Sequence, residues 1–133
     1  MTAPVRLRLS RRKGFDLQAL SHATNGLEAV KVTRPSAFGN PFTVQQAAEV
    51  FDCRRESAQR HATDWFRQWI NAPDDAFEEM REYDGMKPAR DTLLRRLPEL
   101  RGKNLGCFCA RGHACHADVL LELANAPVCE EVA

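Results

Sequence analysis

The sequence predicts a small Rossmann-like α/β layer structure in which helices cover an at least partly parallel sheet. Strand-like apolar or alternating runs lie near both ends of the chain, and amphipathic helical patterns lie between them. Strands separated by helices favour parallel pairing, and 133 residues suit one domain. We expect that domain to span residues 1–126, with a flexible C-terminal tail at residues 127–133. Neither a Gly-x-Gly-x-x-Gly pattern nor a P-loop is present.

Composition restricts the classes of function. With 44% hydrophobic and 28% charged residues, the chain is typical of a globular protein. A net charge of +1 argues against a nucleic-acid binder driven by bulk charge. The chain has no apolar run of the ~20 residues that cross a membrane and no signal-peptide pattern, so we expect a cytoplasmic protein without a membrane partner. In that compartment the five cysteines are expected to be reduced.

The first expected strand is Val5–Leu9, where apolar and basic residues alternate and the three apolar side chains point inward. Five cations lie between Arg6 and Lys13. Two interpretations stay open. The basic side chains are either simply solvated on an edge strand and its turn, or they form a strip that contacts phosphate or nucleic acid.

A polar stretch from Asp16 ends in the turn signal Asn25-Gly26, and residues 28–33 then predict a second strand. Arg34-Pro-Ser-Ala-Phe-Gly-Asn-Pro-Phe42 follows, and its prolines predict a loop of fixed shape. Its polar candidates for function are Arg34 and Asn40. The alternative is an ordinary rigid turn anchored by its two buried phenylalanines.

Helical patterns fill the middle of the chain. Thr43-Val-Gln-Gln46 is a capping box, which predicts a helix through about Phe51. An apolar stripe from residue 56 to about 71 predicts a second helix, whose two tryptophans are core or, less simply, a stacking platform for bases. Residues 74–83 suggest a short acidic helix. Residues 88–97 predict a helix with inward leucines, which Pro98 ends.

The densest chemistry follows a buried strand expected at residues 105–109 and precedes a helix expected at 114–124. Six thiol, imidazole and carboxyl groups fall within twelve positions: Cys107, Cys109, His113, Cys115, His116 and Asp118. Such a concentration of nucleophiles, acid/base groups and soft metal ligands points to a functional site.

Backbone phase suggests how these groups pair. Cys107 and Cys109 share one face of the expected strand. Cys115 falls in the first helical turn, where free N–H groups would lower its pKa and would also favour an anionic ligand. Consecutive helical side chains point roughly 100° apart, so Cys115 and His116 should not pair. Cys115 with Asp118, or Cys109 with His116, is the better arrangement of nucleophile and base.

A metal site is the second interpretation. Cys107, Cys109, Cys115 and His116 form a ligand set suited to zinc, and His113 could replace one of them. The spacing argues against it, since usual ligand pairs are separated by two to four residues. Plain buried cysteines are the third interpretation, and all three stay open.

These segments resemble a known family. Arg34-Pro-Ser-x-x-Gly-Asn-Pro-Phe42, Leu105-x-Cys-x-Cys109 and Cys115-His-Ala-Asp-Val-Leu-Leu-Glu-Leu-Ala-Asn125 are similar to the small bacterial and phage family called domain of unknown function 4326. The resemblance spans about residues 5–125. It implies no activity, but it implies recurrent positions at the three cysteines, His116 and Asp118, and not at His113. It also implies host cytoplasm if the chain is phage-encoded.

We therefore expect a phosphorylated or nucleotide-like small molecule to bind where the two loops meet, because ligands of open α/β sheets lie beyond the carboxyl ends of strands. The expected ligand-binding residues are Arg34, Ser36, Gly39 and Asn40. Cys115 would act as nucleophile or anion contact, His116 or Asp118 as acid or base, and Cys109 as a further catalytic thiol. Whether catalysis occurs stays open. The alternatives are a zinc-stabilised module that contacts a host protein and a nucleic-acid binder that uses the basic N-terminal strand.

Overall fold

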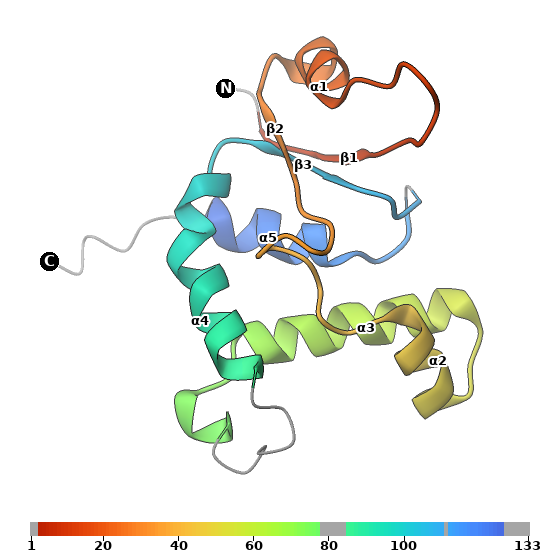
Figure 1. Ribbon diagram of the computed structural model, residues 1–133, viewed down its shortest axis with the longest axis vertical. Coiled ribbons are helices and arrows are strands. Elements are labelled where there is room, and N and C mark those ends of the chain that lie inside the picture. The colour runs from red at the N-terminus through yellow and green to blue at the C-terminus, as the bar shows by residue number, and fades with distance from the viewer. Residues whose placement is uncertain (1–2, 78–84, 111, 127–133) are drawn as a thin grey trace, which may run out of the picture.

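A computed structural model describes residues 3–77, 85–110 and 112–126 (Figure 1). Three parallel strands form one sheet in the order β1-β3-β2. They are β1 (Arg6–Arg8), β2 (Ala29–Lys31) and β3 (Asn104–Cys107). Leu7 pairs with Gly106, and Val30 pairs with Leu105. The predicted α/β layer structure is confirmed, and every strand pairing in the described sheet is parallel.

The central strand β3 is buried along its whole length. Gly106 lets neighbouring side chains pack directly on this strand. A Cβ at this position would lie only 3.0 Å from Leu9 Cδ2 and 3.2 Å from Leu17 Cδ2. Leu17 begins helix α1 (Leu17–Asn25), which lies on one side of the sheet, while α5 (His116–Ala124) lies on the other (Figure 1). The glycine therefore lets a helix approach the middle of the sheet closely.

The sequence did not predict α1, since its segment is polar. Asp16 caps the helix by accepting a hydrogen bond from Ala19 N–H at 3.1 Å, and Gly26 ends it with a φ of 79°. Its buried residue is Ser21, whose hydroxyl donates to the Leu27 carbonyl at 2.5 Å. Hydrogen bonds to the chain, rather than an apolar stripe, hold this helix in place.

The remaining helices of the described residues are α2 (Val44–Phe51), α3 (Arg55–Ile70) and α4 (Met86–Arg96), with short 3-10 turns η1 (Asp74–Phe77) and η3 (Leu97–Leu100). The capping box at the start of α2 is present, and α4 gives way to η3 just before Pro98, as predicted. The prediction of a helix over 74–83 reaches beyond the described residues, as does the predicted tail at 127–133. None of the described helices combines the length and apolarity needed to cross a bilayer.

Three predicted details are wrong. Val5 is 38% exposed rather than inward, because β1 is an edge strand that starts one residue later. Leu94 is likewise exposed on α4. The third strand ends at Cys107, so Cys109 lies beyond it in a bend. The core itself forms between the sheet, α5 and α3, and includes Phe66 and Leu120.

Candidate functional site

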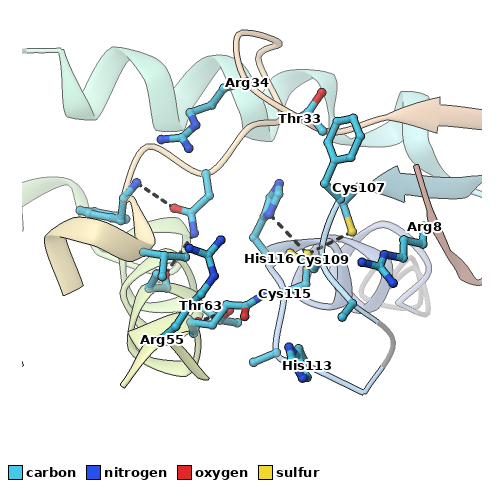
Figure 2. A pocket seen from close by; sticks show the side chains of 18 of the residues that line it. Arg8, Thr33, Arg34, Arg55, Thr63, Cys107, Cys109, His113, Cys115 and His116 are labelled. Carbon is cyan, nitrogen blue, oxygen red and sulfur yellow. Dashed lines mark hydrogen bonds between the residues drawn. The ribbon is translucent and has the colours of Figure 1, made fainter. Parts of the chain in front are cut away.

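The loops that follow the three parallel strands meet at one edge of the sheet, where a cavity of about 630 Å³ opens (Figure 2). Four arginines line it: Arg8, Arg11, Arg34 and Arg55. Cys107, Cys109, Cys115 and His116 also line it. We call this space the arginine-lined cavity. The sequence expectation that the Arg34 loop faces the cysteines agrees with this arrangement, because β2 and β3 are parallel neighbours.

Three of its thiols form one group, here called the cysteine cluster: Cys107, Cys109 and Cys115. All three sulfurs lie within 4.8 Å of one another, and the Cys115 thiol donates to the Cys107 sulfur at 3.3 Å. Cys107 and Cys115 are each only 2% exposed, whereas Cys109 is half-buried. Cys109 is therefore the sulfur of the cluster that a ligand can reach most easily.

The acidic thiol of the cluster is Cys109. Its interactions with the neighbouring Cys107 and Cys115 thiols lower the pKa of Cys109, with a further contribution from the Gln59 side chain on α3. The same contacts raise the pKa of Cys115, and burial adds to that effect. The backbone N–H of Ala117 at the helix terminus lowers the pKa of Cys115, as predicted, but the two thiol neighbours and burial outweigh it, so the predicted net lowering is wrong.

His116 is held as a neutral ring with a defined tautomer. Its Nε2 lies 2.8 Å from the Val32 carbonyl oxygen, which can only accept, so Nε2 carries the proton. Burial lowers the pKa of His116. The lone pair of Nδ1 then faces the Cys115 sulfur at 3.8 Å. The prediction that these neighbours cannot pair is wrong, since Cys115 is the extended N-cap residue of α5 (φ −152°, ψ 144°) and not part of the helix.

The Arg34 loop folds into turns, in which Ser36 N–H donates to the Thr33 carbonyl and Gly39 N–H to the Ser36 carbonyl, each at 3.0 Å. Its residues play different parts. Arg34 lines the arginine-lined cavity, while Ser36 is exposed and Gly39 lies outside the lining. A Cβ at Gly39 would lie 2.7 Å from Arg34 Cγ and 2.9 Å from Arg34 Cα, so glycine permits the position of Arg34. Phe38, in contrast, is a buried anchor, as the alternative interpretation of the loop expected.

Asn40 lines the arginine-lined cavity, yet both ends of its amide are used within the protein. Its Nδ2 donates to the Ala62 carbonyl at 3.1 Å, and its Oδ1 accepts from Phe42 N–H at 2.9 Å. Asn40 thus ties the loop to helix α3. Its contribution to the cavity is to fix the distance between these two walls.

Asp118 lies outside the lining of the arginine-lined cavity. Its carboxylate accepts a hydrogen bond from the Arg6 guanidinium at 2.9 Å. Arg6 also donates to the carbonyls of His113 at 2.9 Å and Ala110 at 3.1 Å. Together, Arg6 and Asp118 fasten the segment between Cys109 and Cys115 to β1 and α5.

Sequence reasoning missed the contribution of helix α3. Arg55, Gln59 and Thr63 on this helix line the arginine-lined cavity. They recur every four residues, so they share one face of the helix. That polar stripe was the available signal. Figure 2 shows Arg34 and Arg55 on one side of the cysteine cluster and Arg8 on the other.

One protein-family model, the domain of unknown function DUF4326, matches residues 18–126. The chain belongs to this family. The match begins inside α1, so β1 of this DUF4326 protein lies outside the matched residues, although the sequence resemblance was expected to begin near residue 5. No curated protein and no solved structure matches the chain.

The arrangement in this DUF4326 protein has two chemical capacities beside anion binding. A thiolate at Cys109 could act as a nucleophile, because deprotonation makes sulfur reactive. Alternatively, three sulfurs within 4.8 Å of one another could hold one metal ion. The cavity walls, in either case, present guanidinium groups to whatever approaches the sulfurs.

Proposed function

We propose that the protein binds a small phosphate-bearing molecule, such as a nucleotide, in the arginine-lined cavity. One observation carries the proposal: four arginines from two strand-end loops, β1 and α3 converge there, and no Asp or Glu is among the described lining residues. Guanidinium groups bind phosphate oxygens in a bidentate manner and stay charged at every physiological pH. A cluster of them without carboxylates therefore favours an anionic ligand.

The charges of these arginines are available to a ligand. Within the described part of the chain, Arg8, Arg34 and Arg55 have no carboxylate at salt-bridge distance. Arg11 lies over the Phe108 ring at 4.0 Å, which orients its guanidinium without neutralising it. A volume of about 630 Å³ suits a ligand of nucleotide size.

A nucleic-acid surface on the basic N-terminal strand is less well supported. The Arg6 side chain is only 12% exposed, and its guanidinium already donates hydrogen bonds to Asp118 and to two backbone carbonyls. The strip of cations that the sequence suggested is therefore divided: Arg6 is largely buried, Arg8 and Arg11 line the cavity, and Arg12 and Lys13 are exposed outside it. Arg8 and Arg11 face a concave space rather than an extended backbone.

Isothermal titration calorimetry with inorganic phosphate, pyrophosphate, AMP and ATP tests the proposal. We expect at least one of these probes to bind, and Arg34→Ala and Arg55→Ala each to weaken its binding by about tenfold or more. Arg60→Ala is the matched control, since Arg60 is an exposed residue on the same helix that contacts Ser57. Failure of all four probes to bind, or an equal loss in the control, would contradict the proposal.

A further inference from the structure

We infer that the cysteine cluster is a Zn²⁺ site in which Cys107, Cys109 and Cys115 supply three thiolates, and the fourth coordination position faces the arginine-lined cavity. The anionic group of the bound molecule would occupy that fourth position. This last step rests on the proposed function, whereas the three-sulfur site does not. Catalytic zinc commonly keeps one position open in this way.

The sulfur positions are close to those that zinc requires. Tetrahedral coordination with Zn–S bonds of about 2.3 Å places sulfurs about 3.8 Å apart. Here all three sulfurs lie within 4.8 Å of one another, and the Cys107–Cys115 pair is 3.3 Å apart. Small side-chain rotations bring such a set to the required distances without moving the backbone.

The backbone that carries the cluster is already fixed. Cys107 ends the buried strand β3, and Cys115 caps helix α5. Arg6 binds the carbonyls of Ala110 and His113 in the segment that joins them. The sulfurs are therefore held together by the fold itself, which lowers the ordering cost of binding an ion.

Charge also favours a cation among these sulfurs. Three thiolates and one Zn²⁺ carry a net charge of −1, which the surrounding arginines offset. Soft thiolate ligands select zinc over harder cations such as Mg²⁺ and Ca²⁺. The arginines would also attract an anion toward the open position of the ion.

His116 is not the fourth ligand in this arrangement, in contrast to the four-ligand set that the sequence suggested. Its Nδ1 lies 3.8 Å from the Cys115 sulfur, but among the described residues the group of ligand atoms that lie within 4.8 Å of one another consists of the three sulfurs and does not include His116. The Nε2 bond to the Val32 carbonyl at 2.8 Å holds the buried ring in place. His116 is a positioning residue that packs beside Cys115.

Metal analysis of the full chain, purified in a phosphine reductant, tests the three-sulfur site. We expect about one zinc per chain, and Cys109→Ser should lose most of it. Cys53→Ser is the matched control, because Cys53 is also a free, half-buried cysteine but lies outside the cavity lining, and it should keep the metal. A chain that carries no zinc, or a Cys109→Ser variant that keeps its zinc, would overturn the site.

X-ray absorption at the zinc edge of the unmodified protein then tests the fourth position. A zinc coordination shell of three sulfurs and one light atom, without the outer-shell pattern of imidazole, supports the open position. A shell that contains the imidazole pattern or a fourth sulfur overturns it. Addition of the best-binding phosphate probe should change the light-atom shell, and an unchanged shell overturns coordination of the anion. Zinc without any anion binding would refute the proposed function, and with it the anion at the fourth position, while the three-sulfur site would stand. Arginine-dependent anion binding without zinc would refute only the metal site.

Discussion

Replacing Arg6 with methionine should destabilise the fold and loosen the cysteine cluster. Methionine keeps much of the apolar stem but removes the guanidinium, which donates to Asp118, His113 and Ala110 at 2.9, 2.9 and 3.1 Å. These acceptors lie on α5 and on the segment between Cys109 and α5. The substitution thus releases three tethers from a single position.

The magnitude follows from the exposure of each partner. Hydrogen bonds to a charged group contribute about 1.5–3 kcal/mol each when buried. The Arg6 side chain is 12% exposed, but Asp118 is 49% exposed, so water recovers part of the loss at the carboxylate. We expect a total loss of about 2–4 kcal/mol in the free energy of unfolding. For a chain of 133 residues, this lowers Tm by about 10 °C.

Urea unfolding followed by circular dichroism measures this loss, with Arg67→Met as the control. Arg67 pairs with Glu122 at 2.9 Å, but their side chains are 46% and 61% exposed, so the control should lose under about 1 kcal/mol. The Arg6 variant should also bind zinc more weakly than the Arg67 variant. If the two variants unfold at the same urea concentration, the reasoning about Arg6 as a tether is refuted.

Two further substitutions test the loop and the opposite end of the sheet. Gly39→Ala should displace Arg34 and weaken anion binding several-fold in calorimetry, because its Cβ would lie 2.7 Å from Arg34 Cγ, while Gly85→Ala meets no atom within 4 Å and should bind normally. Asn104→Ala should cost about 2–4 kcal/mol in urea unfolding, since the fully buried amide accepts Val5 N–H at 2.9 Å and donates to neighbouring side chains. A loss below about 1 kcal/mol would show that water replaces these bonds.

Periodicity was sufficient to predict most of the fold. The alternation around Leu7, the capping box at Thr43 and the stripe of α3 each express one local rule, and each of these elements forms. Helix α1 was not predicted, because its buried residue is Ser21, whose hydroxyl donates a hydrogen bond to the Leu27 carbonyl later in the chain. The periodicity of apolar residues does not predict a helix that is positioned mainly by hydrogen bonds.

The site was predictable as far as strand topology determines it. Parallel pairing of β2 with β3 brings the loop of Arg34 beside the cysteines, and that inference needed only the order of elements. Arg55 and Gln59 could not be placed in the same way, because α3 reaches the cavity through its packing on α5. Side chains delivered by helix packing depend on tertiary contacts that the local sequence does not encode.

The chemistry of Cys115 shows why a boundary error of two residues matters. Inside a first turn, its sulfur would experience the helix dipole, which contributes about 0.3–1 kcal/mol and lowers a thiol pKa modestly. As the extended N-cap residue, it still lies at the helix terminus, but its sulfur points into the cluster, at 3.3 Å from the Cys107 sulfur and 3.8 Å from His116 Nδ1, and the neighbouring thiols and burial outweigh the helix terminus. Three thiolates this close repel one another strongly in a buried site, so without a cation most of the negative charge must stay on one sulfur. A divalent cation removes that restriction, which is why the same crowding that disfavours three free thiolates favours a metal-bound set.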